Sequence, residues 1–133
     1  MARHARDRLS DEAEATGILA LVAKLADDIP FPFRGRVVWL TPEQGSRRSE
    51  PPRADEHVDY ATTAFVPPQT ADSGLASFVL RNVTPGVLVS PAEACWLVVE
   101  NTGPYHIEPG TVVVVTEGFS PVGYFHVDEV RDA

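Results

Sequence analysis

The chain has 133 residues, of which 44% are hydrophobic and 23% are charged, and its formal net charge is −8. A chain of this length can bury one hydrophobic core, and the composition is ordinary for a globular domain, which excludes disorder over the whole length. No apolar run approaches the roughly 20 residues that a membrane-spanning helix requires. Residues 1–8 are basic but are followed by acids instead of an apolar stretch, so we expect a cytoplasmic protein without a secretory signal.

The charge is distributed unevenly along the chain. Residues 34–53 carry five arginines against two glutamates, a net charge of +3. Residues 54–133 carry two arginines against 11 acids, a net charge of −9. Binding to nucleic acid depends on lysines and arginines that replace the counterions of the phosphate backbone. We therefore expect no general nucleic-acid binder, and only residues 34–53 could contact a phosphate backbone.

The N-terminal third is predicted to be the helical part of the chain. Residues 1–9 are predicted to be a disordered tail, and residues 10–34 a helix with a Pro-rich connector. The helix extends from Ser10 to Asp27, because Pro30 and Pro32 end it. Apolar residues recur at helical spacing in it, at Ile18, Leu21, Val22 and Leu25. We expect the apolar residues between the prolines to lie extended across the rest of the domain, since proline disfavours helix in the residue before it.

From Gly35 onward the pattern indicates strands only. Short runs rich in β-branched and aromatic residues alternate with Gly- and Pro-containing turns, and no helix is predicted between them. The predicted strands are residues 36–40, 60–66, 74–80, 87–89, 95–100, 111–116 and 124–127. Such spacing is typical of an antiparallel barrel or sandwich and excludes βαβ units.

Period-two alternation predicts which side chains share a face of a strand, and one of the two faces must point into the core. Thr111, Val113 and Val115 share one face of a strand, and Val112 and Val114 share the other. The large apolar residues assigned to the core are Trp39, Phe78, Trp96 and Phe125, with Cys95 as a small core residue. We expect partial exposure for Phe31, Phe33 and Phe119.

No motif for catalysis is present. The sequence has no phosphate-binding loop, no guanine-reading motif and no Gly-x-Ser-x-Gly elbow, and Cys95 has no electropositive setting that would activate a thiol. His106 with Glu108, and His126 with Asp128, each place two metal-ligand types on one face of a strand. No cysteine or third motif accompanies them. We predict a non-enzymatic protein that binds no nucleotide, cofactor or metal.

Three segments resemble the C-terminal (third) domain of elongation factor Tu. Leu40 to Ser49 is similar to the family's first strand and the arginine-bearing loop after it, and Glu117 to Phe125 is similar to its last hairpin. Asp59 to Phe65 resembles a further strand of that domain, without its arginine. Ile18 to Arg34 resembles the helix and proline-rich exit that end the family's GTPase domain. The resemblance implies that residues 35–131 form a six-stranded antiparallel barrel that acts by surface binding, without the GTPase.

The same resemblance supplies the candidate binding residues. Arg47 and Arg48 match the loop that faces transfer RNA in the family. Arginine suits this role because its planar fork pairs with two phosphate oxygens. Two other interpretations are open: the arginines contact an acidic protein, or they are solvated and pair with Glu43, Glu50 or the acidic barrel. Because acids dominate the chain, we predict a protein-protein interaction domain whose partner-binding residues are Arg47, Arg48, Arg53 and Phe119. The alternative is translation-related binding of transfer RNA.

Overall fold

The computed structural model describes residues 25, 29–46, 50–55 and 58–131. The predicted tail at residues 1–9, and the helix from Ser10 to Asp27 except Leu25, lie outside the described residues, as do Arg47 and Arg48. The strands are β1 (Phe33–Trp39), β2 (Tyr60–Phe65), β3 (Ala76–Arg81), β4 (Val89–Trp96), β5 (Val112–Glu117) and β6 (Ser120–Val130). The short helices are the 3-10 turns η2 (Pro42–Gln44) and η3 (Gly103–Tyr105) and the single turn α2 (Ala71–Gly74).

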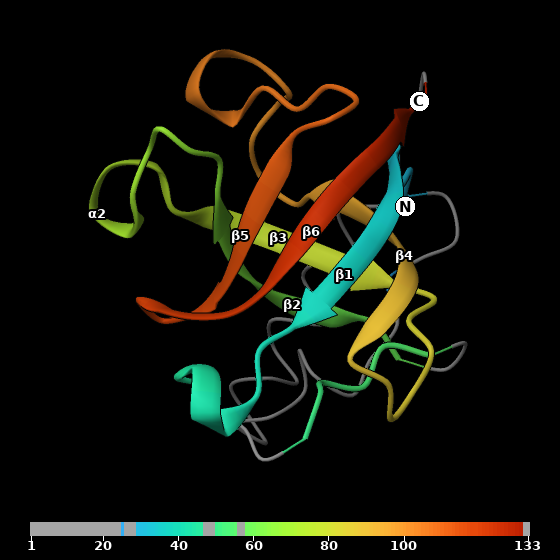
Figure 1. Cartoon of the computed structure of the whole chain (residues 1–133). Coiled ribbons are helices and arrows are strands. Elements are labelled where there is room, and N and C mark those ends of the chain that lie inside the picture. The colour runs from blue at the N-terminus through green and yellow to red at the C-terminus, as the bar shows by residue number, and fades with distance from the viewer. Residues whose placement is uncertain (1–24, 26–28, 47–49, 56–57, 132–133) are drawn as a thin grey trace, which may run out of the picture.

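The six strands close into a barrel in the order β1-β4-β3-β2-β5-β6 (Figure 1). Every neighbouring pair is antiparallel. The prediction of a six-stranded antiparallel barrel is therefore confirmed, and the sandwich alternative is wrong. No described helix is long and apolar enough to cross a membrane.

Because neighbouring strands are antiparallel, the connections between strands fall into two groups, one at each end of the barrel. Residues 40–59, 82–88 and 118–119 connect strands at one end, which we call the loop end. Residues 66–75 and 97–111 connect strands at the opposite end. In Figure 1 the loop end is the lower one, where η2 and the β5–β6 turn lie, and α2 lies at the upper end.

Strand β4 corrects the sequence prediction. Residues 87–89 and 95–100 were predicted as two segments, but the structure has a single strand, Val89–Trp96, and residues 97–100 belong to the next loop. Pro91 made a continuous strand improbable, because proline has no N–H for a sheet hydrogen bond. The structure tolerates it because β3 pairs with β4 only from Glu93 to Trp96, so no β3 residue lies opposite Pro91.

The barrel interior is filled by alternate residues of the strands. Trp39, Phe78, Trp96 and Phe125 belong to this core, as predicted. Val113 and Val115 are completely buried in this core, whereas Val112 and Val114 are not part of it, which confirms that the two sets face opposite sides of β5. Val112 is 37% exposed, but Val114 is only 8% exposed, so the outer face of β5 is also partly covered. Phe33 is also in the core, so the expected partial exposure was wrong. It is the first inward-facing residue of β1, a strand that begins three residues earlier than predicted.

A second, smaller apolar cluster lies on the outside of the barrel. Leu25, Ile29 and Phe31 pack against Val79 of β3 and Cys95 of β4. We call residues 29–32, together with Leu25, the strap. The described part of the Pro-rich connector packs against the barrel through Ile29 and Phe31. The expected exposure of Phe31 is wrong, since only 7% of it is exposed. Cys95 is buried as predicted, but under the strap and not in the barrel interior.

Candidate binding surfaces

The two described candidate residues from the sequence, Arg53 and Phe119, both belong to the loop end. Phe119 occupies the turn between β5 and β6 and is 69% exposed, as expected. Gly118 allows this turn because its φ of 61° is one that other residues rarely adopt. Arg53 belongs to the β1–β2 connection at the same end. Arg47 and Arg48 lie outside the described residues of that connection, so the structure brings together only half of the predicted set.

Every arginine that the structure describes forms an ion pair with an acid. The pairs are Arg34–Glu93 at 3.4 Å, Arg36–Asp128 at 3.6 Å, Arg53–Asp55 at 2.5 Å, Arg81–Asp59 at 2.8 Å and Arg131–Glu93 at 2.8 Å. Arg53 pairs with Asp55 of its own loop. The interpretation in which Arg47 and Arg48 pair with Glu43 or Glu50 concerns residues outside the described ranges. The Arg53 side chain remains 60% exposed in this pair.

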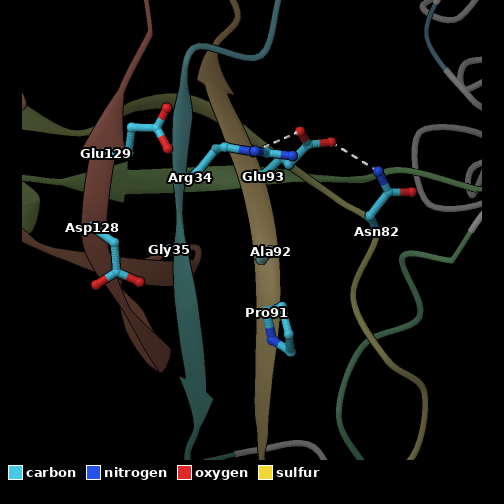
Figure 2. A pocket seen from close by; sticks show the side chains of 8 residues that line it. All are labelled: Arg34, Gly35, Asn82, Pro91, Ala92, Glu93, Asp128 and Glu129. Atoms are coloured by element: carbon cyan, nitrogen blue, oxygen red, sulfur yellow. Dashed lines mark hydrogen bonds and ion pairs between the residues drawn. The ribbon is translucent and has the colours of Figure 1, made fainter.

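A groove of about 370 Å³ lies across the outer faces of β4, β1 and β6 (Figure 2). Figure 2 shows the Arg34 side chain reaching from β1 toward Glu93 of β4, on the side away from Asp128 and Glu129. The carboxylate of Glu93 also accepts hydrogen bonds from Asn82 and Arg131, at 2.8 Å each. Glu93 is therefore satisfied by three partners in this groove, and Asp128 is paired with Arg36. We interpret the groove as a structural junction, because most of its charged groups are already paired.

Gly35 explains why β6 lies so close to β1 beside this groove. The register shifts between Arg34 and Gly35, which face Glu129 and Val127 respectively, so Asp128 is the extra residue of a bulge in β6. A Cβ atom on Gly35 would lie 1.8 Å from the carbonyl oxygen of His126. Only glycine permits this approach. The bulge leaves Asp128 within ion-pair distance of Arg36.

A buried ion pair fixes the strap to the barrel. Only 1% of the Asp59 side chain and 10% of the Arg81 side chain are exposed. Asp59 accepts the backbone N–H of Leu25 at 2.8 Å, and Arg81 donates to the carbonyl of Leu25 at 3.2 Å. The Arg81 guanidinium also lies 4.0 Å above the ring centre of Phe31. Sequence reasoning missed this pair, although an acid just before one β run and an arginine at the end of the next was a usable signal.

The histidine pairs that could have suggested a metal site do not converge. His106 lies 3.2 Å from Glu108, in the loop at the end opposite the loop end. His126 lies on β6, opposite Arg36 and Val112 on the neighbouring strands. Within the described ranges, no group of three or more His, Cys, Asp or Glu side chains could hold a metal ion. A hollow of about 540 Å³ beside His106 is lined by residues of two loops, among them Pro67, Pro68 and Pro104.

An apolar row crosses the outer wall of the barrel. Phe65 of β2 pairs with Val114 of β5, which pairs with Tyr124 of β6. Tyr124 pairs with Val38 of β1, which pairs with Val89 of β4. We call these five residues the apolar row. It continues at the loop end into Leu88 and Val87, which are 46% and 38% exposed.

Comparisons of the chain with protein-family models, with curated proteins and with solved structures give no significant match. The function is therefore inferred from the residues and the geometry alone.

Proposed function

We propose that the chain is a non-catalytic binding module that recognises another protein in the cytoplasm, and that its barrel is related to the C-terminal domain of elongation factor Tu. The closed six-stranded antiparallel barrel supports this relationship. Of the three barrel segments that resemble the family, the run from Leu40 to Ser49 and the turn of the last hairpin both belong to the loop end. A rigid barrel that carries its exposed loops at one end suits recognition through those loops.

The exposed aromatic side chain at the loop end is the observation that carries the proposal. Phe119 is 69% exposed at the tip of a two-residue turn. Exposed Val87 and Leu88 belong to another loop at the same end. Large apolar side chains at the surface cost solvation free energy unless a partner covers them, and aromatic residues are enriched at protein interfaces. The loop end therefore favours a protein partner.

The charge of the loop end does not favour RNA. Residues 41–59 contain five acids and three arginines, counting Arg47 and Arg48. Among the described residues of this loop, Arg53 is already paired with Asp55. A phosphate backbone would meet repulsion here from the remaining carboxylates, so binding of transfer RNA remains the weaker alternative.

The test uses the full chain as bait in a native lysate, with three variants. We expect Phe119→Ser to lose the specific partner, because truncating a central aromatic contact costs about 2 kcal/mol or more, roughly a 30-fold loss of affinity. The double variant Arg47→Ala, Arg48→Ala tests the basic pair in the same way. Val98→Ser is the matched control, since Val98 is 71% exposed but belongs to a loop at the opposite end.

The outcome is read together with the melting temperature of each variant. A variant that loses the partner while melting within a few degrees of the parent assigns its residue to the interface. If neither Phe119→Ser nor the double arginine variant weakens binding, the loop end is not the recognition surface. Capture of transfer RNA that disappears steeply with added salt would support the RNA alternative instead.

A further inference from the structure

The strap is attached to the outside of the barrel and takes no part in closing it. The barrel closes through the pairing of β1 to β6, and the strap precedes β1 in the chain. The strap forms an apolar cluster of its own, separate from the barrel core, in which Leu25, Ile29 and Phe31 pack against Val79 and Cys95. Release of the strap would therefore leave the core filled, and its effect would fall on the residues that anchor it.

The two anchors of the strap lie at the bases of two loop-end connections. Asp59, which accepts the N–H of Leu25, is the last residue of the β1–β2 connection. Arg81, which donates to the carbonyl of Leu25, is the last residue of β3 and precedes the β3–β4 connection. The two connections are also joined to each other, because the N–H of Val83 donates to the carbonyl of Ala54 at 2.7 Å. The strap is therefore fixed to the positions from which both connections emerge.

The third connection at the loop end is tied to the neighbour of an anchor. Tyr60 follows Asp59 in the chain, and its hydroxyl donates to the carboxylate of Glu117 at 2.5 Å. Glu117 is the last residue of β5 and precedes the turn that carries Phe119. The anchor of the strap is therefore one residue away from a hydrogen bond that holds the base of this turn.

A second series of hydrogen bonds joins the strap to the β3–β4 connection. Nη2 of Arg131 donates to the carbonyl oxygen of Phe31 at 3.0 Å and to Glu93 at 2.8 Å. Glu93 also accepts a hydrogen bond from the amide of Asn82 at 2.8 Å (Figure 2). Asn82 is the first residue of the connection, and its φ of 60° is uncommon for residues other than glycine. The strap therefore reaches this connection by two separate routes.

The docked strap keeps the Asp59–Arg81 pair away from water. With the strap in place, 1% of the Asp59 side chain and 10% of the Arg81 side chain are exposed, and the ring of Phe31 lies against the guanidinium. An ion pair in water is screened and contributes little. Release of the strap would expose both charges to water and remove their hydrogen bonds to Leu25. The bases of the two connections would then be held less firmly.

We propose that the strap is a conformational device that sets the affinity of the loop end for its partner. This inference rests on the proposed function and names a regulation of that surface. Docking of the strap fixes the loop-end connections in the arrangement that binds, and release of the strap frees them. Coupling of this kind is reciprocal, so a partner bound at the loop end stabilises the docked strap by the same factor.

Amide hydrogen exchange of the full chain, followed by nuclear magnetic resonance, tests the coupling without a partner. Phe31→Ala and Ile29→Ala each remove an apolar contact of the strap and lie outside the loop end, and the second serves if the first does not fold. We expect the N–H of Val83 to exchange about tenfold faster or more in these variants. The N–H of Val127 donates to Thr111 at 2.9 Å in the barrel wall, and its exchange should change by less than about twofold.

Two controls separate release of the strap from a general loss of stability. The rate at which a thiol reagent labels Cys95 reports release in the same variants, because Cys95 is 3% exposed beneath the strap. Val115→Ala is the matched variant, because Val115 is completely buried in the core and lies outside the strap cluster. It weakens the whole barrel, so it should not accelerate exchange at Val83 more than at Val127.

The protein whose capture depends on Phe119 then tests the regulation itself. Added at saturation to the parent chain, it should slow the labelling of Cys95 about fivefold or more. Labelling that does not change contradicts the regulation, whereas the proposed function stands. If no captured protein depends on the loop end, the proposed function is wrong and this regulation falls with it.

Three exchange outcomes also overturn the proposal. Equal acceleration at Val83 and Val127 in the strap variants would mean that the strap stabilises the fold as a whole. A Val83 N–H that stays protected while Cys95 is labelled would mean that the connections keep their arrangement without the strap. Cys95 that stays protected in both Phe31→Ala and Ile29→Ala would mean that the strap is not released separately from the barrel.

Discussion

Arg81 and Asp59 form a bidentate ion pair beneath the strap, on the outer wall of the barrel. The Nε atom of Arg81 donates to one carboxylate oxygen of Asp59 at 2.9 Å, and Nη2 donates to the other at 2.8 Å. The same two side chains bond the backbone N–H and the carbonyl of Leu25. Each charge is therefore paired and hydrogen-bonded, which is the condition under which buried charges are tolerated. The pair connects the strap to both β2 and β3.

The first prediction concerns this pair. Asp59→Ala should lower the free energy of unfolding by about 3–5 kcal/mol, because it leaves the guanidinium of Arg81 buried without its counter-charge. Urea denaturation followed by fluorescence measures the change. The double variant Asp59→Ala, Arg81→Met should recover part of the loss, since it removes both charges. Arg53→Ala is the control, because its pair with Asp55 is more exposed and should contribute less than about 1 kcal/mol.

The second prediction concerns the close approach of β6 to β1. Gly35→Ala should destabilise the protein by about 3 kcal/mol or more, because its Cβ would overlap the carbonyl of His126 and the strands would have to separate. Gly118→Ala is the matched control. It has open space around it and only an unfavourable φ, so it should cost about 1 kcal/mol. Equal costs for the two variants would show that β6 does not contact β1 in this register.

The third prediction tests the two faces of β5. Val113→Ala and Val115→Ala should each cost about 2 kcal/mol, because both side chains are fully buried in the core. Val112→Ala should change the stability by less than about 0.5 kcal/mol, because Val112 is 37% exposed. Thermal or urea unfolding of the three variants measures this. A loss at Val112 as large as that at Val113 would mean that the strand is covered on both faces.

The fourth prediction uses Cys95 to report on the strap. Cys95 is 3% exposed under Leu25, Ile29 and Phe31, so a thiol reagent should label the native protein slowly. Phe31→Ala should accelerate the labelling, about tenfold for each 1.4 kcal/mol by which it weakens the strap. The rate of labelling is measured from the absorbance of the group that the reagent releases when it reacts with the thiol. Labelling that stays slow in Phe31→Ala would show that the strap does not protect Cys95.

The local sequence pattern was sufficient to predict most of the strands of the barrel. The β-branched run in β5 predicted a strand and the two sets of its residues that share a face. The exposed position of Phe119 followed from the turn that contains Gly118. Strand β4 was predicted as two segments, whereas the structure accommodates Pro91 within one strand, and this tolerance depends on where a neighbouring strand ends. The burial of Phe31 could not be predicted, because the residues that cover it, Val79 and Cys95, are distant in sequence.

Alternation and turn residues are properties of neighbouring positions, so they were enough to predict a β domain from residue 35 onward and which residues of β5 share a face. Which residues meet across the strands depends on how the six strands are brought together in the fold. Asp59 and Arg81 are 22 residues apart in the sequence. Most pairings of the apolar row, which extends from Phe65 to Val89, join residues that are even further apart. The register between neighbouring strands of the closed barrel sets these pairings. The periodicity within a single strand contains no information about that register.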